Sequence, residues 1–158
     1  MRSIWFLDCL FRDLSPDTDP DASYALLELS APPGSQPPPH IHHNEDEGFY
    51  VLDGEITLFG PDGETTLRPG EHLTTPRGVP HTFRAGPDGV RALVISAPGG
   101  FARFVRDFGV PAERDELPTL DGPPDLAALT EVAARNGIEF VGPPGALPAP
   151  AAPAASSA

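Results

Sequence analysis

GSQPPPHIHHNEDEGFYVLDG, residues 34–54, holds two histidines, His40 and His42, that are one residue apart, and a carboxylate, Glu47, five residues after the second. Side chains alternate between the two faces of a β-strand, so both histidines point the same way. Imidazole nitrogens and carboxylate oxygens are common ligands of divalent transition metals. The stretch therefore predicts most of a metal site, and His81 is the candidate for the remaining ligand.

The residues that flank this stretch complete a longer pattern. Its members are Gly34, His40, His42, Glu47 and Gly54, separated in turn by five, one, four and six residues. In residue type and in spacing, the stretch resembles the first motif of the cupin family without a mismatch.

A later stretch resembles the second cupin motif. Its members are Gly70, Pro76, Gly78 and His81, separated by five, one and two residues. It departs from the family only at its end, where cupins usually have Asn and this chain has Ala85, and that Asn is not a metal ligand. The similarity to the quercetin dioxygenase-like branch extends outward to IWFLDCL, to PGGFARFVRDFG and to NGIEFVGPP.

This resemblance implies an all-β fold, a cupin jelly-roll β-barrel with short C-terminal helices. It also implies a set of metal ligands: His40, His42, Glu47 and His81. Glu45 and Asp46 compete for the carboxylate position, but only Glu47 fits both intervals, and Asp46 faces the other side of a regular strand. We expect His43 and His72 to be exposed or hydrogen-bonded histidines without a metal.

Composition narrows the classes of function. The chain has 158 residues, enough for one domain with a sizeable core, and a formal net charge of −13. That charge disfavours binding to nucleic acid or to an anionic membrane surface. All ten basic residues are Arg. Without Lys, Schiff-base chemistry and a P-loop are excluded.

The location of the protein is an expectation from two further features. Cys9 is the only cysteine, so no intramolecular disulfide can form, which suits a reducing compartment. Asp8 and Arg12 interrupt the apolar start of the chain, which argues against a signal peptide. We also find no apolar run of about 18 residues that could span a membrane. A cytoplasmic protein is the expected outcome.

Short apolar segments between Gly- and Pro-rich turns predict an antiparallel β-domain. Asp53-Gly54 is a strong signal for a two-residue hairpin between two of these strands. The predicted strands are 24–29, 49–52, 55–59, 65–67, 72–75, 80–84 and 90–97.

Helical periodicity replaces the strand pattern after Gly100. Apolar residues in 101–108 follow helical spacing, and Gly109 is a stop signal. We expect this Phe-rich stripe to pack on the core and to cap one end of the barrel. A polar linker over 110–122 leads to a second helix that starts near Asp125 and ends at Asn136-Gly137. A final extended piece covers 138–141.

Four regions follow from these patterns: an N-terminal arm (1–22), the cupin barrel core (23–98), a helical segment packed on the barrel (99–141) and a disordered Pro/Ala tail (142–158). Residues 13–22 within the arm are expected to form an acidic, turn-rich loop. Related cupins often pack such an arm on a second subunit. An exposed apolar arm would be a patch that needs a cover, so a homodimer is expected.

Strand alternation predicts the pocket that faces the metal. Phe49 and Val51 share a face with Glu47, and Phe83 shares a face with His81. The predicted site is a divalent ion (Fe, Ni, Mn, Co, Cu or Zn) in an apolar, aromatic pocket. In quercetin dioxygenase-like cupins the Glu that corresponds to Glu47 can also take the substrate hydroxyl proton, and burial raises the proton affinity that this role needs.

Three functions are compatible with this pattern. The first is a metal-dependent dioxygenase that acts with O2 on an enolisable aromatic substrate, such as a flavonol or polyphenol. The second is a non-redox cyclase or isomerase of an aromatic polyketide-type substrate, because the ligand set is the same. The third is a cupin that binds a small molecule without catalysis. Among these, the length of the resemblance favours the dioxygenase.

Overall fold

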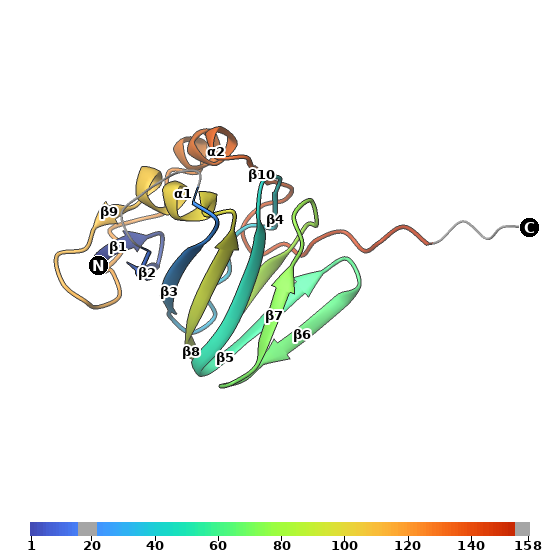
Figure 1. The fold of residues 1–158 in the computed structure, drawn as a ribbon, viewed down its shortest axis with the longest axis horizontal. Coiled ribbons are helices and arrows are strands. Elements are labelled where there is room, and N and C mark those ends of the chain that lie inside the picture. The colour runs from blue at the N-terminus through green and yellow to red at the C-terminus, as the bar shows by residue number, and fades with distance from the viewer. Residues whose placement is uncertain (16–21, 154–158) are drawn as a thin grey trace, which may run out of the picture.

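The computed structural model describes residues 1–15 and 22–153, which form a strongly curved β-structure with two helices at one end (Figure 1). The strands are β1 (Arg2–Phe6), β2 (Cys9–Asp13), β3 (Ala25–Ala31), β4 (His40–His42), β5 (Asp46–Gly60), β6 (Gly63–Leu67), β7 (His72–Thr75), β8 (Thr82–Ala97), β9 (Val110–Pro111) and β10 (Ile138–Phe140). The helices are α1 (Gly100–Phe108) and α2 (Leu126–Arg135).

The strands are paired antiparallel in two sheets. The larger sheet has the order β6-β5-β8-β3-β2-β1-β9, and β7 pairs with β5. The smaller sheet pairs β10 with β4, so the strand that carries His40 and His42 is held by the last strand of the chain. The predicted all-β fold with short C-terminal helices is confirmed.

Alternation in the sequence builds the core. In β3, the sequence ALLELSA buries every second side chain, namely Ala25, Leu27, Leu29 and Ala31. Burying a Leu side chain stabilises the fold by roughly 1.5–3 kcal/mol, so one such face contributes much of the stability of a small sheet. The other face of β3 stays half-buried.

The hairpin predicted at Asp53-Gly54 is wrong. Strand β5 continues through this dipeptide without reversing, and both of its halves pair with β8. The register shifts on each side of Gly54, whose φ is +73°, so the glycine serves a β-bulge. The two short strands predicted at 49–52 and 55–59 are therefore one long, bent strand.

The partner strand differs in the same way. The segments predicted at 80–84 and 90–97 are joined in β8, which starts at Thr82. Gly54 pairs with Val90 and Ile56 with Ala85, so residues 86–89 face only Glu55. Residues 86–89 are therefore a bulge in β8, where they make no regular pairs with β5. Such a bulge bends the paired strands, which lets them curve around the barrel.

The N-terminal residues form a hairpin within the same molecule. Strand β1 pairs with β2, and β2 pairs with β3, which adds the hairpin to the main sheet. Phe6 and Leu10 are buried in this arrangement. The expectation of a homodimer is based on an exposed apolar arm, and these two residues are not part of such a patch. Of the acidic loop predicted at 13–22, residues 16–21 lie outside the described residues.

Both predicted helices are present. Helix α1 buries Phe101, Phe104 and Val105, and ends at Gly109. Asp125 caps α2 by accepting a hydrogen bond from the Ala128 amide at 3.0 Å. Within the described residues, neither helix is long enough and apolar enough to cross a membrane.

The C-terminal segment makes contacts where we expected disorder. Of the predicted tail, residues 142–153 are described and 154–158 are not. The carbonyl of Ala146 accepts a hydrogen bond from the Gln36 side chain (3.3 Å), and the Ala151 amide donates to the Pro61 carbonyl (3.0 Å). Apolar spacing in the sequence gives no sign of these contacts, because main-chain groups of the tail make them.

A buried ion pair fixes α1 on the N-terminal hairpin. Asp13 in β2 is buried and accepts hydrogen bonds from Nε and Nη2 of Arg106 in α1. We expect Asp13→Ala to lower the free energy of unfolding by about 2–4 kcal/mol, because it leaves a partly buried guanidinium without its partner. Denaturant unfolding measures this loss. Glu116→Ala is the control, since Glu116 pairs with Arg114 in solvent, and a change of more than about 1 kcal/mol there would contradict the assignment.

Candidate metal centre

The structure brings the four predicted ligands together. One nitrogen from each of three histidines and one carboxylate oxygen lie within 4.8 Å of one another, and all four residues are buried: His40, His42, Glu47 and His81. Strand β4 supplies the first two, because alternate residues of a strand share a face. Glu47 lies at the start of β5. His81 is added by a backbone pair, in which His40 and His81 exchange two N–H···O bonds of 2.9 Å.

The Nδ1 atoms of the three histidines all face hydrogen-bond acceptors. His40 Nδ1 lies 2.7 Å from the Pro38 carbonyl, and His81 Nδ1 lies 3.1 Å from the Val79 carbonyl. His42 Nδ1 lies 3.0 Å from Oε1 of Glu45. An acceptor at Nδ1 places a proton there, which leaves the Nε2 lone pair of a neutral ring for a metal.

Glu45 has a role that the sequence did not reveal. We weighed it only as a competitor for the carboxylate ligand, yet it is 1% exposed and its oxygen holds the far side of the His42 ring. The other competitor, Asp46, faces outward and binds the Arg77 side chain. The expectation that Asp46 points away from the site is thus confirmed.

Burial and neighbouring charges shift the pKa values of His40 and His42 in opposite directions. Burial lowers the pKa of His40 to about 3, and the neighbouring His81 and His42 add to this effect. Burial also acts against a charge on His42, but Glu47 and Glu45 outweigh it and raise its pKa to about 10. His40 is therefore a neutral donor, whereas His42 carries a proton when no metal is bound.

Glu47 behaves differently from the expectation of a raised proton affinity. Burial does raise its pKa, but the charge of His42 and the hydrogen bond with His81 outweigh burial and hold the pKa well below its usual range. Oε2 of Glu47 lies 2.9 Å from His81 Nε2 and 3.3 Å from His42 Nε2. Without a metal, Glu47 is a stable anion.

The donor set fits a divalent transition metal. Three imidazole nitrogens and one carboxylate oxygen suit Zn, Fe, Co, Ni, Cu or Mn. One atom already lacks a partner: Nε2 of His42 is fully buried and makes no hydrogen bond, despite its distance of 3.3 Å from Glu47. A buried nitrogen without a partner costs free energy, and a cation among these atoms would remove that cost.

We expect metal binding to release about one proton per site at neutral pH. A metal competes with the proton that the raised pKa keeps on His42, so affinity should weaken as the pH falls. Calorimetric titration with Zn²⁺ in buffers of different ionisation enthalpy measures the proton count. His72→Ala is the control, because that exposed histidine should not alter it. A metal affinity that does not change with pH would contradict this expectation.

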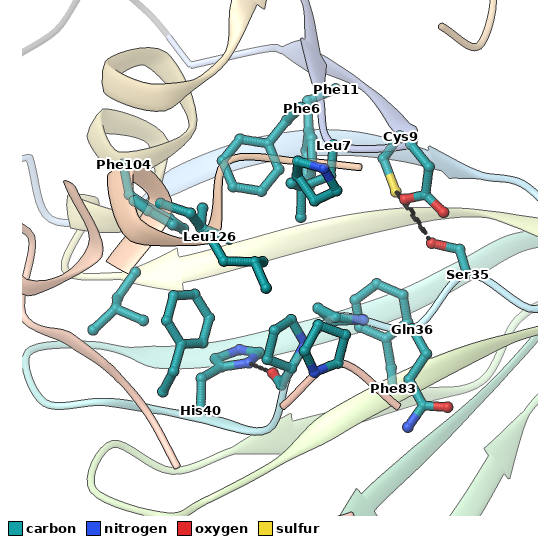
Figure 2. A pocket seen from close by; sticks show the side chains of 18 of the residues that line it. Phe6, Leu7, Cys9, Phe11, Ser35, Gln36, His40, Phe83, Phe104 and Leu126 are labelled. Atoms are coloured by element: carbon teal, nitrogen blue, oxygen red, sulfur yellow. Dashed lines mark hydrogen bonds between the residues drawn. The ribbon is translucent and has the colours of Figure 1, made fainter. Parts of the chain in front are cut away.

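A largely apolar cavity of about 270 Å³ opens on the site, and His40, His42 and Glu47 lie in its wall. Figure 2 shows this cavity with His40 in its lining. Phe83 lines it as predicted. Phe49 and Val51 do not line it, although they lie on the predicted face of β5. They are buried in the core, where the ring of Phe49 packs against that of Phe83 at 5.9 Å. Alternation predicts which side chains of a strand point into the barrel. It does not predict which of them pack in the core and which line a cavity.

The opposite wall of the cavity comes from segments far along the chain. Its apolar side chains lie in the N-terminal hairpin, in both helices and in β10: Phe6, Leu7, Phe11, Phe101, Phe104, Leu126, Leu129, Ile138 and Phe140. The Phe stripe of α1 thus closes the cavity as expected. The contributions of the hairpin and of α2 could not be predicted from periodicity. Periodicity indicates which face of an element is buried, but it does not indicate which other element covers that face.

The remaining histidines have ordinary surroundings. His43 Nε2 lies 2.7 Å from Oε2 of Glu139 at the surface, and His72 is exposed. The expectation that these two histidines are hydrogen-bonded or exposed is confirmed.

Comparison with known proteins agrees with the site. The cupin domain model matches residues 27–96. Quercetin 2,3-dioxygenase from Bacillus subtilis is 28% identical over 70% of this chain and 33% of its own length. Quercetin 2,3-dioxygenase from Aspergillus japonicus is 32% identical over 72% of this chain and 35% of its own length. The chain therefore spans about a third of each of these relatives.

Solved structures show the same fold. An RmlC-like cupin from Shewanella frigidimarina superposes with a TM-score of 0.54 at 17% identity, covering 62% of this chain and 85% of its own. At such identity the likeness concerns the fold alone. The domain match, the barrel and the buried histidine–glutamate group together show that residues 27–96 are a cupin domain, and the chain is similar in sequence to the quercetin 2,3-dioxygenases.

Proposed function

We propose that this cupin is a metal-dependent oxygenase, similar to quercetin 2,3-dioxygenase, that acts with O2 on an enolisable aromatic substrate such as a flavonol or polyphenol. The observation that carries the proposal is that the candidate metal centre and an aromatic binding space meet in one cavity. An apolar, phenylalanine-rich space of about 270 Å³ opens directly on His40, His42 and Glu47. Such a lining favours a flat aromatic molecule over a sugar phosphate or an amino acid.

His40, His42, Glu47 and His81 would hold the divalent ion. When bound, such an ion polarises a substrate oxygen and offers open positions for further ligands. The chain itself contributes orientation. Backbone carbonyls and Glu45 fix the histidine rings, and the aromatic wall excludes water and aligns the substrate ring.

Glu47 is our candidate for the catalytic base. Its carboxylate is ionised and lies in the cavity wall, so it is in the correct state to accept a proton from a substrate hydroxyl. The proton on His42 is one of the main causes of the low pKa of Glu47. Once His42 is neutral, the carboxylate becomes a stronger base.

Oxygen uptake tests the proposal. Protein reconstituted separately with Fe, Ni, Mn, Co, Cu and Zn is mixed with a panel of flavonols and polyphenols. We expect O2 consumption and loss of the flavonol absorbance with at least one redox-active metal. Conversion of a polyketide-type substrate without O2 uptake would instead select the cyclase or isomerase. Binding without any turnover would select a non-catalytic small-molecule cupin.

A further inference from the structure

The cavity has a second polar end. Apart from the candidate metal ligands, its described lining contains four residues with polar side chains: Asp8, Cys9, Ser35 and Gln36. Figure 2 shows Cys9 and Ser35 together on the side of the cavity away from His40. The two ends are separated by the phenylalanine-rich walls.

Asp8 is held in place from two directions. One of its oxygens, Oδ1, accepts hydrogen bonds from the Ser35 hydroxyl at 2.9 Å and from the Cys9 thiol at 3.3 Å. Burial and the neighbouring Asp8 raise the pKa of Cys9 well above its usual value, so the thiol remains a neutral donor. Ser35 is itself fixed to the barrel, since its carbonyl accepts from the Ala85 amide at 2.9 Å.

The second oxygen of Asp8, Oδ2, has no hydrogen-bond partner among the described residues, and Asp8 is a half-buried residue of the cavity lining. Asp8 lies in the two-residue turn between β1 and β2, where its neighbour Leu7 has a φ of 55°. Glycine is favoured at such a φ. The chain instead keeps a leucine there, and its side chain lines the cavity.

We infer that Asp8 is a specificity-determining residue that accepts a hydrogen bond from a hydroxyl at the end of the substrate remote from the metal centre. The inference rests on the proposed function for the identity of the aromatic ligand. A carboxylate can only accept hydrogen bonds. It therefore favours a phenolic hydroxyl and disfavours a methyl ether or a ketone, which would leave its charge desolvated and unpaired.

Three flavonols that differ at one position test this inference. Galangin, kaempferol and kaempferide carry hydrogen, hydroxyl and methoxy, respectively, at the para position of the pendant ring. Binding is measured by calorimetry on Zn-loaded protein without oxygen. We expect kaempferol to bind about tenfold more tightly than kaempferide, the size of a hydrogen bond to a charged group. In Asp8→Asn, whose amide can also donate to an ether oxygen, the ratio should fall to about two or less.

Two further variants keep the test decisive. Asp62→Asn makes the same chemical change in an exposed turn outside the cavity and should keep the wild-type ratio. Ser35→Ala removes a donor that orients Asp8 and should reduce the ratio by about threefold, which covers the case in which Asp8→Asn does not fold. A wild-type ratio in both Asp8→Asn and Ser35→Ala would overturn the inference.

Failure of the proposed function gives a different result. If none of the three flavonols binds, the proposed substrate class is wrong. The role of Asp8 is then decided with 2-naphthol and 2-methoxynaphthalene on metal-free protein. A preference for the naphthol that Asp8→Asn abolishes supports the inference. Equal binding of both compounds, or binding of neither, overturns it.

Discussion

Glu47→Gln protein that is fully loaded with metal should turn over its substrate about 10²- to 10⁴-fold more slowly than the wild type, the loss typical of a missing general base. The amide keeps the shape of the side chain and still offers an oxygen, but it cannot accept a proton at neutral pH. Elemental analysis establishes the metal content, and substrate consumption at equal occupancy gives the rate. Comparing rates at equal occupancy separates loss of the base from loss of a ligand.

Glu45→Gln is the matched control. It is the same substitution at the other buried carboxylate of the site, which hydrogen-bonds to Nδ1 of His42 and not to the metal-facing nitrogen. Loss of such an outer contact weakens metal binding by roughly 10- to 100-fold, so activity should return when metal is supplied in excess. Near-normal turnover by metal-loaded Glu47→Gln would exclude the base role and favour chemistry in which the ion alone polarises the substrate.

The candidate ligands could be predicted because their arrangement is mostly local. His40 and His42 share a face of one strand, and Glu47 opens the next strand. His81 comes from 34 residues beyond Glu47, and family resemblance, not alternation, pointed to it. The role of Glu45 could not be predicted, because it depends on how the chain bends between β4 and β5.

The lining of the cavity could be predicted only in part from sequence patterns. Helical spacing in α1 correctly indicated a buried phenylalanine stripe, and the stripe lies over the metal centre, with the Phe101 and His42 rings 5.3 Å apart. The hairpin turn that brings Leu7 and Asp8 to the same cavity has no local signal of that kind. Its position results from the pairing of β2 with β3 across the main sheet.

Asp53-Gly54 illustrates an ambiguity between two structures. A glycine with positive φ suits both a tight hairpin and a β-bulge, so the dipeptide alone does not separate them. The partner strand makes the difference. Because β8 is long enough to pair on both sides of Gly54, β5 continues through the bulge.

This arrangement predicts a large loss of stability for Gly54→Ala. A Cβ at this position would lie 2.3 Å from the Gly89 carbonyl oxygen and 3.1 Å from the Val90 Cα, both backbone atoms that cannot turn aside. The left-handed φ of +73° adds strain for any residue with a Cβ. Together these effects should lower the free energy of unfolding by about 3–5 kcal/mol, measured by denaturant unfolding.

Gly34→Ala is the control that isolates the steric contact. Gly34 has nearly the same φ, +72°, but no atom lies within 4 Å of the point that a Cβ would occupy there. Strain alone should therefore cost about 1–2 kcal/mol at this position. The difference between the two variants measures the close approach of β5 and β8 at the bulge. Equal losses of stability in the two variants would mean that β5 and β8 can move apart at Gly54 without cost. The bulge would then not be a rigid bend in the pair of strands that carries Glu47 and Phe83.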